Sequence, residues 1–144
     1  IGAGPGEGYN LNLPVAPRSG WDDYAPALDV ALRRVSEHGT ELLVVALGVD
    51  TAVEDGVLAF GEDDFRRLGA TIAEAGLPTV LVQEGGYDLD ALEASVGETV
   101  RVLADPTLRT DEFPAPSAPA SELVGTLREA HARFWPELTR RIQA

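Results

Sequence analysis

Two almost purely apolar runs constrain the fold of this chain more than any other feature. They are LLVVAL at 42–47 and TVLV at 79–82, and each leads into a segment with a polar end, LGVD closing at Asp50 and EGGY closing at Tyr87. Short apolar runs bounded by turn residues are typical of buried parallel strands. Because ligands bind outside the carboxyl ends of such strands, we expect Asp50 and Tyr87 to lie on adjacent loops at one edge of the sheet.

Helical periodicity accompanies the candidate strands. Apolar residues recur at helical spacing over residues 22–38, about 62–75 and about 88–104, and a glycine follows each of the first two segments. The segment YNLNLPV at 9–15 alternates apolar and polar residues, as a strand does. Strand and helix therefore alternate three times, which predicts an α/β fold with a parallel sheet and right-handed crossovers.

The end of the chain has a different composition. Residues 105–120 are rich in proline and lack periodicity, which predicts a covering loop, and residues 121–142 predict a C-terminal helix that Pro136 kinks or interrupts. The length of 144 residues fits one domain. Three parallel strands would leave two exposed sheet edges, and the sequence begins at Ile1 and contains no methionine. We therefore expect this chain to be part of a longer polypeptide.

The composition excludes several classes of protein. The formal net charge is −13 and every basic residue is an arginine, so no basic face is available for nucleic acid. The acidic surface suits a polycationic substrate, or it only maintains solubility. The sequence has no cysteine, which excludes disulfides, thiolate metal sites and cysteine nucleophiles. No apolar run reaches the roughly 18 residues of a membrane span and no signal peptide is recognisable, so we expect a soluble, cytoplasmic protein with no membrane partner.

Several polar groups have both a structural and a functional interpretation. Asp50 is either a turn cap or a metal ligand, and Tyr87 is either a core or rim residue or a hydrogen-bond donor at a site. His38 and His131 fall on expected helices away from the strand ends, which favours packing or surface roles. The glycines at 1–8 have the wrong spacing and context for a dinucleotide-binding loop. The start of the helix expected at about 62–75 is favoured by three acids that interact with the helix dipole, Glu62, Asp63 and Asp64.

As a set, these segments resemble the C-terminal half of the histone deacetylase and acetylpolyamine amidohydrolase family. The matching segments follow the family's order at about its spacing: IGAGPGEGYNLNLPV, Gly20-x-Asp22-x-Tyr24, LLVVALGVDTAVED and PTVLVQEGGY. They cover residues 1 to about 104, and EAHARFWPEL resembles the C-terminal helix of the class II branch. The motif GVDT followed by EGGY is similar to the corresponding motifs of bacterial acetylpolyamine amidohydrolases and class II-like deacetylases. The resemblance implies an arginase-like, three-layer αβα fold, of which this chain is an incomplete part.

The resemblance also implies roles for five residues. Asp50 would be one of three protein ligands of a zinc ion, and Tyr87 the phenol that polarises the scissile amide carbonyl. Val57 falls where the family lines its acyl-lysine tunnel, and Gly85 and Gly86 would let the chain pass close to the tunnel floor. Zinc in such a site activates water and acts as a Lewis acid, and a donor to the developing oxyanion is worth on the order of 3 kcal/mol.

Two features depart from the family's pattern. Gly56 follows Asp55 where the family usually has proline, so we expect a looser loop beside the tunnel. The aspartate and histidine that complete the zinc site lie upstream in the family, as do the paired histidines that serve as general base and electrostatic partner, and this sequence contains none of them. The resemblance therefore implies that the remaining groups come from an N-terminal half of the same fold.

The sequence thus predicts a zinc-dependent amidohydrolase that removes acetyl groups from acetylpolyamines or acetyl-lysine, with the isolated 144-residue chain inactive. The alternative is a non-catalytic interaction module that retains the fold, and an unrelated flavodoxin-like ligand-binding domain is a third hypothesis. The negative charge favours polyamines, although solubility accounts for it equally. The oligomeric state stays open, with a homo-oligomer among the alternatives.

Overall fold

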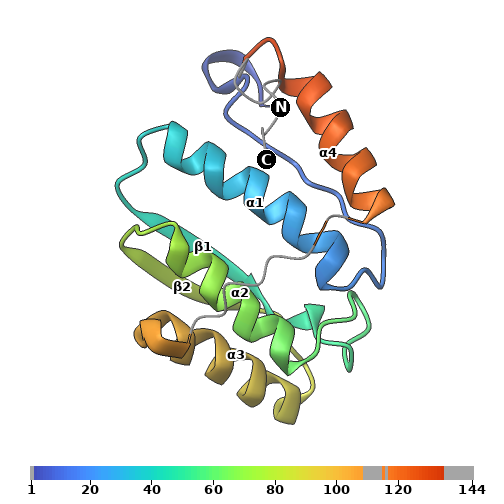
Figure 1. The fold of residues 1–144 in the computed structure, drawn as a ribbon, viewed down its shortest axis with the longest axis vertical. Coiled ribbons are helices and arrows are strands. Elements are labelled where there is room, and N and C mark those ends of the chain that lie inside the picture. The colour runs from blue at the N-terminus through green and yellow to red at the C-terminus, as the bar shows by residue number, and fades with distance from the viewer. Residues whose placement is uncertain (1, 109–114, 116, 135–144) are drawn as a thin grey trace.

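The structure is a computed structural model that describes residues 2–108, 115 and 117–134 (Figure 1). In this part of the chain, two strands form a sheet and the longer helices lie beside it. None of the described helices is long and apolar enough to cross a lipid bilayer. The bounds of the main elements are α1 Trp21–Glu37, β1 Leu43–Gly48, α2 Glu62–Glu74, β2 Thr79–Glu84, α3 Leu89–Ala104 and α4 Ala118–His131.

The two apolar runs form a parallel sheet, as the sequence predicts. β1 and β2 are paired in register from Leu43 and Thr79 at one end to Gly48 and Glu84 at the other. Both strands therefore end at the same level. This register brings the residues that follow each strand to one edge of the sheet, which is where the sequence placed the polar groups.

The predicted strand at 9–15 is wrong, because these residues form no strand in the described structure. Their alternation nevertheless corresponds to burial, since Leu11, Leu13 and Val15 are half-buried while the residues between them are exposed. Leu11 packs beside Val30 of α1, and Val15 packs against the main core. An extended segment that packs through alternate side chains shows the period of a strand without pairing to one. The described sheet therefore has two strands instead of three.

The predicted helices over 22–38, 62–75 and 88–104 are confirmed as α1, α2 and α3, each bound lying within one residue of the expected one. Gly39 and Gly76 follow α1 and α2 with φ of +74° and +65°, the left-handed conformation that commonly ends a helix. The three acids expected to favour the start of a helix lie in the first turn of α2, and one of them also caps it. The carboxylate of Asp64 accepts a hydrogen bond from the N–H of Gly61 at 3.0 Å, next to Glu62 and Asp63 in the first turn.

The helix α4 begins at Ala118, three residues before the predicted start at Ser121. Ser117 caps it, because its hydroxyl oxygen accepts a hydrogen bond from the N–H of Ala120 at 3.1 Å, and Pro119 lies in the first turn. The Ser117 hydroxyl also donates to the carboxylate of Asp23 on α1. The covering loop predicted over 105–120 is therefore shorter. Residues 109–114 and 116, and the expected helical residues beyond 134 with Pro136, lie outside the described residues.

An aromatic cluster fixes the loop between β1 and α2 to the core. The ring of Phe60 makes edge-on contacts with Trp21, Tyr24 and Phe65, at centroid distances of 6.0, 5.1 and 5.7 Å. The backbone of Phe60 also donates to the carbonyl of Thr51 at 3.2 Å. The loop thus leaves the sheet after Gly48 and is fixed to the core at Phe60, which restrains the segment that carries Asp50.

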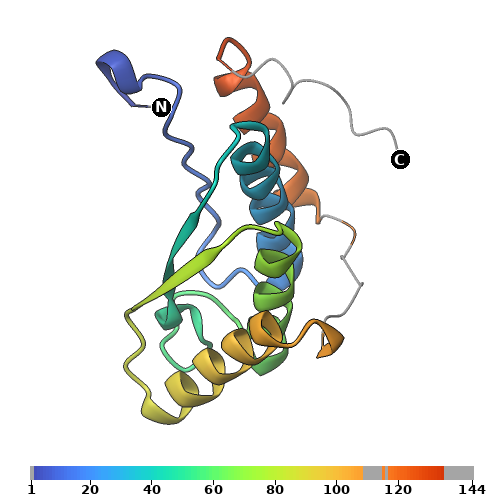
Figure 2. The same ribbon diagram turned by 90° about the vertical axis from the view of Figure 1, so that its left-hand side faces the viewer.

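One face of the sheet is open in the described structure. Figure 2 shows the helices on one side of β1 and β2. Residues on the opposite face are exposed, and the exposed fraction is 60% for Val44, 47% for Val80 and 48% for Val82. The expectation that the strands are buried on both faces is therefore wrong for the described residues, because none of these residues forms a helix over that face. They supply the sheet and one helical layer of the expected αβα arrangement.

Candidate functional site

The segments that follow β1 and β2 meet at the carboxyl edge of the sheet. Asp50 lies in a 3-10 turn, Val49–Thr51, directly after β1. Its carboxylate lies against Gly85, so that a β-carbon on Gly85 would be 3.0 Å from Cγ and 3.1 Å from Oδ1 of Asp50. The structure therefore confirms that the two loops are adjacent, as the pair of strand ends predicts.

The two glycines before Tyr87 allow this close approach. Gly85 and Gly86 have φ of +62° and +86°, which favours glycine at both positions. A β-carbon on Gly86 would lie 3.0 Å from Cβ of Val49 and 3.0 Å from Cδ1 of Leu92. A side chain at either position would push the loop after β2 away from the turn that carries Asp50.

Tyr87 is held by its backbone while its side chain is 80% exposed. Its N–H donates to both carboxylate oxygens of Asp55, at 3.0 and 3.3 Å, and the N–H of Asp88 donates to Oδ1 of Asp55 at 3.2 Å. The sequence predicted no role for Asp55 in the site. The signal was limited to an acidic residue in the short loop after Asp50, and the direction of its side chain depends on the turn that the loop adopts.

The loop between Asp50 and α2 also contains Gly56 and Val57. Gly56 has a φ of +80°, which the ring of proline cannot adopt, so this loop differs in its backbone from one with proline at that position. Val57 is exposed, and its carbonyl accepts a hydrogen bond from the N–H of Arg18 at 2.9 Å. The expected place of Val57 beside an acyl tunnel, and the looser loop, stay predictions.

Asp50 fits the role of one metal ligand, because it presents carboxylate oxygens at the edge of the sheet and Gly85 leaves room for them. Among the described residues, however, no group of three His, Cys, Asp or Glu side chains could hold a metal ion. Asp50 therefore does not form a metal site with its described neighbours.

The two histidines lie away from this edge of the sheet. His38 lies edge-on to the ring of Tyr9 at 5.4 Å, and His131 is buried at the end of α4, so both have the packing or surface roles that the sequence favours.

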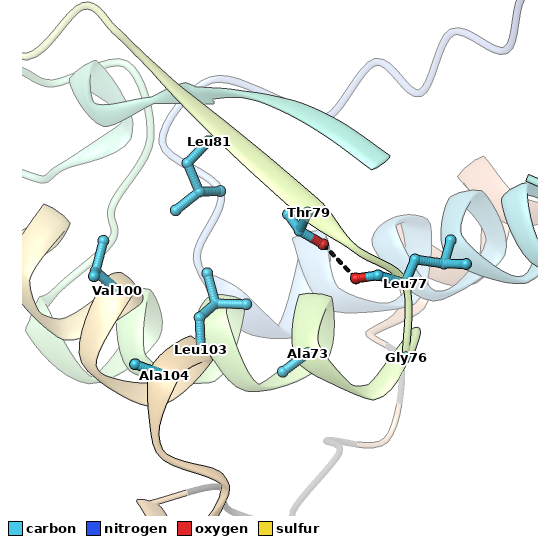
Figure 3. Close-up of a pocket in the computed structure, with 8 residues that line it drawn as sticks. All are labelled: Ala73, Gly76, Leu77, Thr79, Leu81, Val100, Leu103 and Ala104. Atoms are coloured by element: carbon cyan, nitrogen blue, oxygen red, sulfur yellow. Dashed lines mark hydrogen bonds between the residues drawn. The ribbon is translucent and has the colours of Figure 1, made fainter. Parts of the chain in front are cut away.

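A hollow of about 480 Å³ lies at the other end of β2 (Figure 3). Its wall comes from α2, α3 and the start of β2, whereas Tyr87 follows the end of that strand. The side chains that line it are apolar except for Thr79, whose hydroxyl donates to the carbonyl of Leu77 at 2.9 Å. This hollow therefore offers no group for acid–base or nucleophilic chemistry. It is lined by Ala73, Gly76, Leu77, Thr79, Leu81, Val100, Leu103 and Ala104.

The fold places this chain among α/β proteins of the deacetylase class. The crystal structure of the HDA15 HD domain matches 96% of this chain with a TM-score of 0.82 and 27% sequence identity, and the match covers 38% of that domain. The acetylpolyamine aminohydrolase from Burkholderia pseudomallei matches 76% of this chain with a TM-score of 0.68 and 39% identity, over 32% of its own length. Residues 1–103 match the histone deacetylase domain family. The chain therefore belongs to the histone deacetylase family.

The relatives include enzymes named for polyamine substrates. Acetylpolyamine amidohydrolase 1 of Pseudomonas aeruginosa is 46% identical over 93 residues, which cover 63% of this chain and 27% of that enzyme. The human polyamine deacetylase HDAC10 is 34% identical over 144 residues, which cover 96% of this chain and 22% of that protein. This chain thus spans about a quarter of the length of these relatives.

Proposed function

We propose that this chain is part of a zinc-dependent amidohydrolase that removes acetyl groups from acetylpolyamines or acetyl-lysine. The observation that carries the proposal is the contact between the Asp50 carboxylate and Gly85, two residues before Tyr87. This contact joins two segments, LGVD and EGGY, in which the family resemblance implies a zinc ligand, Asp50, and a catalytic tyrosine, Tyr87. Membership of the histone deacetylase family supports the reaction type.

Each of the five predicted residues has a place in this proposal. Asp50 is one ligand of the zinc ion, which when bound supplies a Lewis acid and an activated water. Tyr87 donates a hydrogen bond from its phenol to the oxygen of the scissile carbonyl, on which negative charge develops during the reaction. The exposure of the Tyr87 side chain leaves this phenol accessible to a substrate. Val57 lines the tunnel for the acyl group, and Gly85 and Gly86 keep side chains out of its floor.

The remaining zinc ligands and the general base come from an N-terminal half of the same fold. The open face of the sheet supports this proposal, because parallel sheets are normally covered on both faces. The exposed side chains of Val44, Ala46, Val80 and Val82 form a continuous apolar surface for such a covering layer. The 144-residue chain alone is then inactive, since neither of its two histidines, His38 and His131, lies on the segments that carry Asp50 and Tyr87 and could serve there as the general base.

Acetylated polyamines are the favoured substrates. The net charge of −13 attracts polycations to the surface of the chain. The 46% identical relative is also named for acetylpolyamines. Acetyl-lysine shares the acetylated primary amine with these compounds, so the two substrates are to be compared in one assay.

The proposal is tested on the intact protein that carries this sequence. We expect bound zinc and deacetylation of an acetylated polyamine, with Tyr87→Phe lowering kcat on the order of 100- to 1000-fold while zinc content is unchanged. Tyr9→Phe is the matched control, because Tyr9 is also an exposed tyrosine but lies on the N-terminal segment. Full activity in Tyr87→Phe would contradict the role of the phenol. An intact protein with neither zinc nor activity would favour the non-catalytic interaction module.

A further inference from the structure

Asp55 connects the loop after β1 to the start of α3. Its carboxylate accepts the hydrogen bonds from the N–H groups of Tyr87 and Asp88, which lie 32 and 33 positions further along the chain. We propose that Asp55 is a positioning residue whose carboxylate fixes the backbone of Tyr87 and thereby the place of its phenol at the reacting carbonyl. The inference rests on the proposed function, and it adds a residue to which the family resemblance assigned no role.

Among the described residues, few contacts other than this anchor restrain Tyr87. Gly85 and Gly86, which precede it, have wide backbone freedom and occupy the left-handed region. Its side chain is mostly exposed, and among the described residues its ring makes no aromatic contact. The backbone is therefore where Tyr87 is held. Asp88, on the other side, begins α3 and caps it by accepting a hydrogen bond from the N–H of Ala91 at 2.9 Å.

An aspartate suits this position for two physical reasons. A carboxylate has two oxygens that only accept hydrogen bonds, and its charge makes each bond stronger than one to a neutral group. The acceptor also lies at the amino end of α3, where the helix dipole favours negative charge. Asparagine has the same shape but loses the charge and one acceptor oxygen, so it separates the effect of hydrogen bonding from that of packing.

Asp55 is itself held in place. Its N–H and that of Gly56 both donate to the carbonyl of Ala52, at 3.1 and 3.2 Å, and Ala52 is buried. The loop that contains Asp55 also begins with Asp50. One restrained loop therefore carries the proposed zinc ligand and the anchor of the proposed catalytic tyrosine, so the two groups keep a fixed relation to each other.

The first test measures the anchor directly, by amide hydrogen exchange in the intact protein. We expect Asp55→Ala to accelerate exchange of the Tyr87 and Asp88 amides by roughly 10- to 100-fold, with a smaller effect for Asp55→Asn. Asp105→Asn is the matched control, because Asp105 also accepts a hydrogen bond from a backbone N–H, that of Thr107 at 2.9 Å, but at the far end of α3. Unchanged exchange at Tyr87 in Asp55→Ala overturns the inference.

The second test asks whether Asp55 acts through Tyr87. We expect Asp55→Asn to lower kcat by roughly 10- to 100-fold with KM little changed, and to have almost no further effect when Tyr87→Phe is already present. Equal effects of Asp55→Asn in both backgrounds overturn the positioning role. An unfolding midpoint close to that of the wild type shows that the variant is folded, and Asp55→Ser replaces it if it is not.

The two proposals fail in different ways. If Tyr87→Phe keeps full activity, the proposed function fails, and with it the catalytic part of this inference. If Tyr87→Phe loses activity while Asp55→Asn keeps it, the proposed function stands and the role of Asp55 is overturned. Faster exchange at Tyr87 together with a loss of kcat that depends on Tyr87 supports both.

Discussion

The carboxylate of Asp50 packs against the backbone of Gly85 across the carboxyl edge of the parallel sheet. The contact is possible because Gly85 has no side chain and a φ of +62°. It joins two segments that lie more than thirty positions apart in the sequence and brings together the loops that carry Asp50 and Tyr87. Substitution of Gly85 is therefore a sensitive probe of the site.

We expect Gly85→Ala to destabilise the protein by two separate effects. Alanine at a left-handed φ costs about 1–2 kcal/mol, and its β-carbon would also displace Asp50. Gly76→Ala is the matched control, because Gly76 has a φ of +65° with no atom within 4 Å of the added β-carbon. Urea unfolding measures the free energy of unfolding of both variants. We expect Gly85→Ala to lose about 1 kcal/mol or more beyond the loss in Gly76→Ala. Equal losses would show that Asp50 moves aside at no cost.

A second prediction concerns the close packing of α2 on α3. A β-carbon on Gly69 would lie 2.7 Å from the carbonyl oxygen and 3.1 Å from Cα of Thr99, and these backbone atoms cannot move without α3. We expect Gly69→Ala to reduce the free energy of unfolding by about 1–3 kcal/mol. Gly97 in α3 has open space around it, so Gly97→Ala should stabilise the protein by up to about 1 kcal/mol through helix propensity.

The opposite signs make this pair of variants informative, because both replace a glycine inside a helix by alanine. Thermal or urea unfolding of the two variants under the same conditions is sufficient. A Gly69→Ala variant that is as stable as the wild type would mean that α2 and α3 separate easily. In that case the packing of α3 on α2 would not hold the segment after Tyr87 in a fixed position.

The sequence was sufficient for the elements whose signals are local. The apolar runs predicted β1 and β2, and the periodicity with Gly39 and Gly76 predicted the helices and their ends. The strand predicted at 9–15 is wrong because Leu11, Leu13 and Val15 are half-buried between exposed residues, and an extended segment that packs in this way has the period of a strand without pairing to one. The predicted start of α4 is three residues late because the proline-rich composition obscures a capping serine, Ser117, followed by proline in the first turn.

The candidate site was predictable in part. Parallel strands in register bring their carboxyl ends together, so the adjacency of the Asp50 and Gly85 segments followed from the two apolar runs alone. The role of Asp55 did not, because its hydrogen bond to Tyr87 spans 32 positions and depends on the turn at Ala52 and Gly56. The open face at Val44 and Val82 could not be predicted either, because the apolar pattern shows that a face is suited to burial but not which residues cover it.

The last prediction concerns the stability of the protein at alkaline pH. Burial raises the pKa of the Tyr24 phenol above its ordinary value of about 10. The unfolded chain therefore releases this proton at a lower pH than the folded chain, and above about pH 10 the folded state binds more protons. The contribution of the Tyr24 phenol to the free energy of unfolding is fully present below about pH 10, and it is lost as the pH rises towards the folded-state pKa of Tyr24.

We accordingly expect the urea midpoint of the wild type to fall more steeply between about pH 9 and pH 11 than that of Tyr24→Phe. The ring of Tyr24 packs edge-on against Phe60 at 5.1 Å, and phenylalanine preserves this contact, so the comparison isolates the phenolic proton. Identical slopes for the wild type and Tyr24→Phe would show that the phenol reaches solvent in the folded protein, and that the aromatic cluster around Phe60 is looser than the structure indicates.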